Sequence, residues 1–132
     1  MITRKELLEA QNTAKRIRSI RKQIDAAYNT YHSPSFYGVK RTTLADPVTT
    51  ALHRIDNLTE ELAGCCESLI PFLDELMQIP DSMTRTIIVE HYLLGYSWQK
   101  CTKEVYGINR SESARIRLYR YLKKVENNEQ ET

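Results

Sequence analysis

The chain has 132 residues, of which 41% are hydrophobic and 27% are charged, and its formal net charge is +2. These fractions are ordinary for one folded domain, or for a small domain with an extended arm, and they argue against disorder throughout. The chain has no run of eighteen apolar residues and no basic segment followed by an apolar one, so neither a membrane span nor a secretion leader is expected.

The small net charge hides four blocks of alternating sign. Residues 1–43 carry nine Lys/Arg and three Asp/Glu, residues 44–96 carry two and nine, residues 97–125 carry eight and two, and residues 126–132 add three glutamates. The blocks therefore carry +6, −7, +6 and −3. A basic segment followed by an acidic one favours antiparallel pairing of the two.

The sequence predicts one long helix over residues 4–31, because no Gly or Pro interrupts it and apolar residues recur at spacings of three and four. Arg21 occupies the one missing position in this seam, which otherwise consists of Leu7, Ala10, Ala14, Ile17, Ile24, Tyr28 and Tyr31. Residues 32–46 are rich in turn and cap residues and are expected to form a connector.

A second long helix is predicted over residues 47–79, because Asp46 and Pro47 have the pattern of an N-cap followed by proline at the first helical position. Pro71 removes one backbone hydrogen bond, so a kink or a break is expected there. The apolar seam of this helix consists of Val48, Leu52, Ile55, Thr59, Leu62, Cys66, Leu69, Leu73 and Leu76. Residues 1–79 are therefore expected to form a long antiparallel helical hairpin, whose seams pair within the chain or, alternatively, between the chains of a homodimer.

Residues 80–125 are predicted to form three shorter helices. Cap and stop residues mark their ends: Asp81 and Ser82 before the first, Gly95 after it, Ser97 before the second, Gly107 after it, and Asn109 or Ser111 before the third, which runs to about Lys124. Residues 126–132 form an acidic tail that is expected to fray. The expected fold class is therefore all-α: a long antiparallel helical hairpin followed by a three-helix helix-turn-helix unit.

The third short helix has an apolar stripe opposite an arginine-rich face. Guanidinium groups pair with phosphates or with guanine edges, and a helix fits the major groove, so duplex DNA is the expected partner. A solvated basic face with no ligand would show the same pattern. The residues expected to face bases are Glu112, Ser113, Ile116 and Arg117. The residues expected to contact phosphates are Lys100, Lys103, Arg110, Ser111, Arg115 and Arg120.

The sequence offers no constellation for catalysis. His32, His53 and His91 show no ligand spacing with each other or with the cysteines, and the Cys65-Cys66 pair lacks a CxxC partner. There is no glycine-rich phosphate loop and no nucleophile elbow. We therefore expect no enzyme, no metal site and no cofactor. The odd number of cysteines favours reduced thiols in a cytoplasm.

Several short segments resemble region 4 of sigma factors: Arg85-Thr-Ile-Ile88, Tyr92, Gly95-Tyr-Ser-Trp98, Gly107-Ile-Asn109 and the arginine-rich helix that follows. The arrangement is most similar to the sigma-like domain of phage late-gene transcriptional regulators of the RinA/ArpU type. That resemblance implies sequence-specific promoter binding, contact with host RNA polymerase, and a location at the nucleoid of a bacterial host cell. The chain departs from the pattern at Cys101-Thr102, where an apolar residue followed by Ala is usual.

Two other functions fit the same sequence. A DNA-packaging protein of the small-terminase type also joins a helix-turn-helix to helical assembly elements, and a large ring in solution would favour it. A helical protein-interaction module would use the hairpin to bind a partner and leave the basic helix unused.

Overall fold

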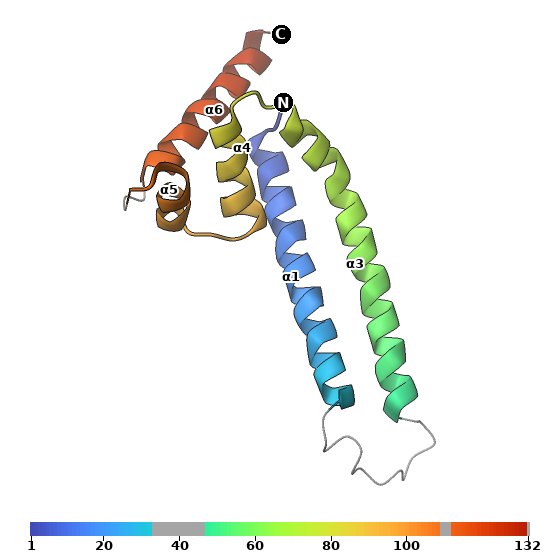
Figure 1. Ribbon diagram of the computed structural model, residues 1–132. Coiled ribbons are helices and arrows are strands. Elements are labelled where there is room, and N and C mark those ends of the chain that lie inside the picture. The colour runs from blue at the N-terminus through green and yellow to red at the C-terminus, as the bar shows by residue number, and fades with distance from the viewer. Residues whose placement is uncertain (33–46, 109–111, 132) are drawn as a thin grey trace. The chain divides into compact units, whose positions relative to one another are not determined.

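The computed structural model describes residues 1–32, 47–108 and 112–131, and in these ranges the chain is helical with no β-strand (Figure 1). This confirms the all-α class. The elements in chain order are α1 (Arg4–His32), α3 (Pro47–Met77), α4 (Ser82–Ile88), the π-helical turn η1 (Val89–Leu93), α5 (Trp98–Tyr106) and α6 (Glu112–Glu131). None of the helices in the described ranges is long and apolar enough to cross a membrane.

The chain divides into two compact units. Unit 1 combines Met1–Lys15 with Leu69–Thr132, and unit 2 is Arg16–Ser68. The expected boundary at residue 79 follows the sequence order of the elements, whereas the compact units cut through both long helices. The first turns of α1 and the last turns of α3 therefore pack with the C-terminal helices.

In unit 2 the buried side chains come from both long helices: Ile20 from α1, and Ile55 and Leu58 from α3. Arg16 of α1 forms an exposed ion pair with Glu61 of α3. Helix α3 is continuous through Pro71, so of the two expected outcomes, a kink or a break, the break does not occur.

The predicted apolar seams are correct at some positions and wrong at others. In α3, Ile55 and Leu76 are buried as expected, but Leu52 and Leu73 are 46% and 40% exposed. Four neighbouring residues lie on the inner side instead: Ala51, Leu58, Cys65 and Phe72. A helix with apolar residues at both members of most such pairs has two possible seams about 100° apart, and packing against the partner selects one.

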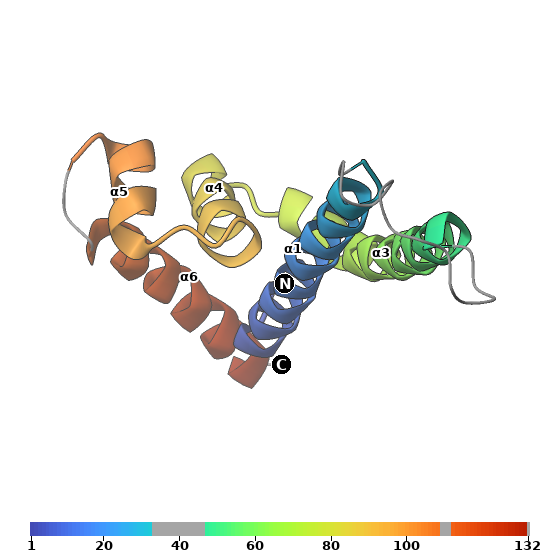
Figure 2. The ribbon, with the colours of Figure 1, turned by 90° about the horizontal axis from the view of Figure 1, so that it is seen from below.

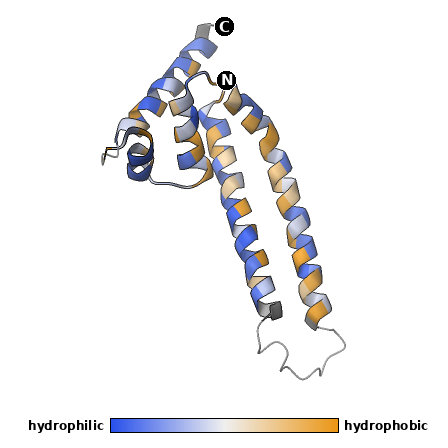
Figure 3. Cartoon of the chain, viewed as in Figure 1, coloured by the Kyte–Doolittle hydropathy of each residue, from blue (hydrophilic) through white to orange (hydrophobic). Residues whose placement is uncertain are grey.

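The core of unit 1 draws on every helix that enters it. Ile2, just before α1, is fully buried, and so are Ile87 and Ile88 of α4, while Leu118 of α6 is 2% exposed. Burying such side chains contributes about 1.5–3 kcal/mol each. Figure 2 shows α6 running beneath α4 and α5, with its C-terminal half beside the first turn of α1. Figure 3 shows the same helices banded by hydropathy, as expected for helices with one buried face.

Local chemistry explains where the short helices begin and end. Asp81 is the N-cap of α4, and its carboxylate accepts a hydrogen bond from the Met83 N–H. The first of the three short helices does not stay α-helical up to Gly95, because it changes to the π-helical turn η1 at Val89. A π-helical turn of this kind is a single-turn feature that frequently occurs at functional sites. Gly95 then turns the chain with a positive φ of 79°.

The second and third short helices are also bounded largely as predicted. The Ser97 side chain accepts from the Lys100 N–H and caps α5, and Gly107 ends that helix in the left-handed conformation with a φ of 71°. The third helix extends further than expected, because α6 continues through the acidic tail to Glu131. The predicted starting residues of α6, 109–111, lie outside the described residues.

Candidate nucleic-acid interface

Helix α6 packs one face into unit 1 and turns the other to solvent. Its inner stripe, with Ala114, Leu118, Leu122 and Val125, is buried. Three of these residues join the core cluster that also contains Ile87 and Cys101: Ala114, Leu118 and Leu122. The inner stripe fixes how the helix is rotated about its axis, so the opposite side chains must face outward.

The outward face is cationic. Arg115, Arg120, Lys123 and Lys124 are all exposed. Within the described ranges, the side chains of Arg115, Arg120 and Lys124 make no hydrogen bond or ion pair. The Lys123 ammonium lies 5.3 Å from the centre of the Tyr119 ring. Lys123 and Lys124 were not among the site residues predicted from the sequence. Their positions opposite Leu118 and Leu122 on a helical projection would have been the signal.

Three of the four residues expected to face bases lie near the start of this surface. Glu112 and Ile116 are exposed, and Ser113 is half-buried. Ile116 is a large aliphatic side chain with 45% of its surface exposed among charged residues. Together these side chains offer a carboxylate, a hydroxyl and an apolar group at one end of α6.

Arg117, the fourth residue expected to face bases, is half-buried and already bonded to other side chains of unit 1. Its Nε and Nη2 donate to the Asp81 carboxylate at 2.9 and 3.1 Å, and its Nη1 donates to the Tyr106 hydroxyl at 3.1 Å. The Thr84 hydroxyl donates to the same carboxylate at 2.6 Å. These donors, Arg117 first, hold the pKa of Asp81 at about 2, and the same pairing raises the pKa of Arg117. The guanidinium therefore links α6 to the cap of α4, so a contact with a base would require this pairing to open.

On α5 the two predicted phosphate contacts differ. Lys100 and Lys103 are both exposed, but the Lys100 ammonium lies 3.8 Å from the centre of the Tyr96 ring. Lys103 has no side-chain partner within the described ranges. The other two predicted contacts in this part of the chain, Arg110 and Ser111, lie outside the described residues.

A buried hydrogen bond couples α5 to the start of α6. The Ala114 N–H donates to the Thr102 Oγ1 at 3.3 Å, and the Thr102 side chain is fully buried beside Cys101. Ala114 is in the first turn of α6, where backbone N–H groups lack partners within the helix. The Cys101-Thr102 pair, which departs from the sigma-like pattern, thus supplies a hydroxyl acceptor from one helix to the next.

Aromatic rings of η1 and α5 pack against each other next to α6. The His91 ring stacks on the Trp98 ring with centroids 3.6 Å apart, and Tyr92 meets Trp98 edge-on at 6.3 Å. The His91 Nδ1 lies 2.7 Å from the Tyr96 carbonyl oxygen, and burial lowers the pKa of this histidine. A neutral ring with Nδ1 protonated satisfies that geometry.

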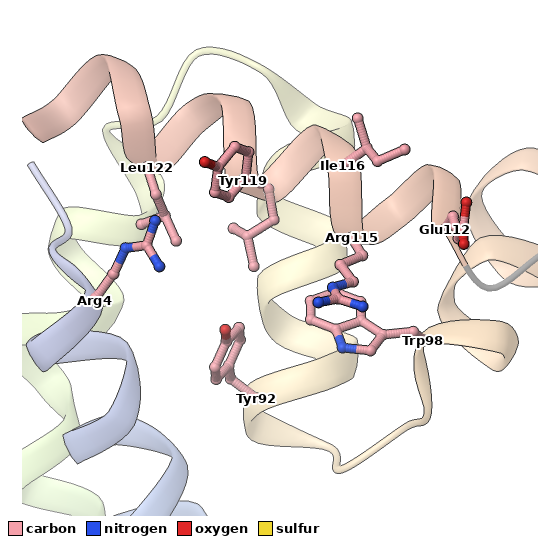
Figure 4. A pocket seen from close by; sticks show the side chains of 9 residues that line it. Arg4, Tyr92, Trp98, Glu112, Arg115, Ile116, Tyr119 and Leu122 are labelled. Carbon is pink, nitrogen blue, oxygen red and sulfur yellow. The ribbon is translucent and has the colours of Figure 1, made fainter. Parts of the chain in front are cut away.

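An open cavity of about 400 Å³ lies on the flank of α6, toward α1 and η1 (Figure 4). Its lining combines aromatic and aliphatic side chains with three charged ones: Arg4, Tyr92, Trp98, Glu112, Arg115, Ile116, Leu118, Tyr119 and Leu122. Arg4 is paired with Glu126 at 2.8 Å and lies 5.7 Å from the centre of the Tyr119 ring. Sequence reasoning did not find this cavity, because Arg4 and Trp98 are 94 positions apart in the chain.

Comparison of the chain with models of known protein families, with curated proteins and with solved structures finds no match.

Proposed function

We propose that this protein is a sequence-specific DNA-binding transcriptional regulator that inserts α6 into the major groove of duplex DNA. The observation that carries the proposal is the outward face of α6, where Arg115, Arg120 and Lys124 have no partner in the described part of the chain. Arg120 and Lys124 lie one helical turn apart on this face, and unpaired cations on a rigidly packed helix are what phosphate binding requires.

The arrangement of α4, α5 and α6 supports a helix-turn-helix reading of this region. Helix α5 ends at Tyr106 and α6 begins at Glu112, and the Thr102–Ala114 hydrogen bond holds the start of α6 against α5. The Asp81–Arg117 pair fixes α6 to α4. In such a motif the N-terminal part of the second helix contacts base edges. Glu112, Ser113 and Ile116 occupy that part.

On this proposal the side chains divide into two groups. Arg115, Arg120, Lys123 and Lys124 bind phosphates together with Lys103, whereas Glu112, Ser113 and Ile116 select sequence. A carboxylate accepts from cytosine N4, and an aliphatic side chain contacts the thymine methyl group. The biological setting that we propose is a phage or prophage late-gene activator, non-enzymatic, that contacts host RNA polymerase and dimerises through α1 and α3.

The test is selection of bound duplexes from a random pool, followed by affinity measurements on the selected and on a scrambled duplex. We expect Arg120→Gln to weaken binding to both duplexes by a similar factor, and Ile116→Ala to weaken the selected duplex more than the scrambled one. Lys22→Gln, an exposed charge change on α1, is the matched control and is expected to bind like wild type. Recovery of no consensus, with equal affinity for all duplexes, would exclude sequence-specific regulation.

The packaging alternative gives a different result in the same preparation. A regulator is expected to be a monomer or dimer by light scattering, whereas a packaging subunit forms a large ring. A ring would favour the packaging function even if DNA binding is observed.

A further inference from the structure

The cavity beside α6 contains two opposite charges that the protein leaves unpaired. Glu112 and Arg115 are three positions apart on one helix, close enough for their side chains to meet. Within the described ranges, neither the Glu112 carboxylate nor the Arg115 guanidinium makes a hydrogen bond or an ion pair, although both line the cavity. The cavity therefore presents one acceptor and one multiple donor to any small molecule that enters it.

Between and below these charges the lining is apolar. Leu118 and Leu122 are nearly buried, and Tyr92 and Trp98 pack against the core of unit 1. Because His91 stacks on the Trp98 ring, the indole is already held in place before any ligand binds. Figure 4 shows Arg115 beside Trp98, with Tyr92 and Tyr119 further along the cavity and Glu112 at one end. A preformed cavity that is lined by aromatic and aliphatic side chains and carries a few polar groups is typical of small-molecule sites.

We propose that this cavity binds a free amino acid with a large apolar side chain, which would compete with DNA for Glu112 and Arg115. The α-carboxylate would accept hydrogen bonds from the Arg115 guanidinium, the α-ammonium would donate to the Glu112 carboxylate, and the side chain would cover Trp98 and Leu122. The pairing of one cation and one anion matches the two charges of the ligand, and the third charged lining residue, Arg4, is already paired with Glu126, so no net charge is left at the site. The volume of about 400 Å³ lies in the range usual for sites of this kind.

The ligand's own chemistry gives the sharpest test, and no DNA is needed. Trp98 is the only tryptophan of the chain, so a single indole N–H signal in a ¹H–¹⁵N NMR spectrum reports on the cavity. We expect L-phenylalanine to shift this signal in a saturable way. Phenylpropionate, which lacks the ammonium, and phenethylamine, which lacks the carboxylate, should each bind at least about tenfold more weakly, since each loses a charge-assisted hydrogen bond. Equal binding of all three compounds, or no shift with any of them, would overturn the proposal.

Two protein variants separate the roles of the two charges. Arg115→Met should weaken the binding of phenylalanine and phenylpropionate but leave that of phenethylamine unchanged. Glu112→Gln should weaken the binding of phenylalanine and phenethylamine but leave that of phenylpropionate unchanged. Arg120→Met and Glu104→Gln remove exposed charges that do not line the cavity, and they should bind phenylalanine like wild type. Because all four side chains are exposed, their loss should leave the fold intact, and the dispersion of the backbone signals checks this. Equal weakening by cavity and control variants would refute the assignment.

Discussion

Replacing Asp81 with Asn isolates the ionic part of the contact that fixes α6 to α4. Asparagine caps a helix about as well as aspartate, so the hydrogen bond to the Met83 N–H can persist while the charge that binds Arg117 is lost. A fall in pKa from 3.8 to about 2 corresponds to about 2.4 kcal/mol, at 1.36 kcal/mol for each tenfold change in acid dissociation. The Arg117 and Asp81 side chains are 36% and 41% exposed, so solvent screening reduces the expected loss to about 1 kcal/mol.

The contribution of this pair depends on pH in a defined direction. Because the pKa of Asp81 is lower in the folded protein than in the unfolded chain, its stabilising effect is complete above about pH 4. It is lost as the pH falls toward 2. The difference in stability between wild type and Asp81→Asn should therefore be constant from pH 5 to 7 and disappear near pH 2.

Urea unfolding followed by the fluorescence of Trp98, the only tryptophan and a residue of unit 1, measures this difference. Arg117→Gln should cost at least as much in wild type, because it also removes the hydrogen bond to Tyr106. It should cost clearly less in the Asp81→Asn background, since the Asp81–Arg117 contact is then already weakened. Arg120→Gln, an unpaired arginine of the same helix, should change stability by less than about 0.5 kcal/mol. Additive losses for Asp81→Asn and Arg117→Gln would refute the structural role of Arg117.

Three further outcomes follow from the same packing. Thr102→Val should destabilise unit 1 by about 1–2 kcal/mol in urea unfolding, because it leaves the buried Ala114 N–H without an acceptor, whereas Thr102→Ser keeps the hydroxyl and should cost less. Gly107→Ala should cost about 1 kcal/mol from backbone strain alone, since a Cβ there meets no atom within 4 Å while φ is +71°, and Gly107→Asn should cost less in the same assay. Cys66 should react with a thiol reagent at pH 8 well before Cys101 does, because Cys101 is buried and burial raises its pKa to about 11; equal rates would contradict that packing.

The helices were predictable where the sequence carries a local signal. Ser97 and Gly107 satisfy backbone groups within one turn of their own position, so the bounds of α5 could be predicted from the sequence. The π-helical turn η1 has no such signal. In this geometry the Tyr96 N–H, one residue after Gly95, donates a hydrogen bond to the Glu90 carbonyl. Whether that bond forms depends on the packing of η1 against the rest of the protein.

The seams and the site depended on contacts between distant residues. In α3 the inner side holds Leu58 rather than Thr59, and Phe72 rather than Leu73. In the first pair, the greater hydrophobicity of leucine could have indicated which residue is buried. Arg117 looked equivalent to Arg120 in the sequence, because Asp81, which holds it, lies 36 positions earlier. The outward cations of α6 follow from helical periodicity alone, but which arginine is already paired depends on the tertiary fold.

The dependence of DNA affinity on salt tests the central claim most directly. If about five side chains of α5 and α6 neutralise phosphates, the logarithm of the affinity for a duplex should fall with the logarithm of salt concentration with a slope of roughly −4 to −5. The double variant Arg120→Gln/Lys124→Gln should reduce the magnitude of that slope by about two, and Lys22→Gln should leave it unchanged. A flat salt response, or a slope that is the same in wild type and in the double variant, would contradict the assignment of the outward face of α6 to DNA.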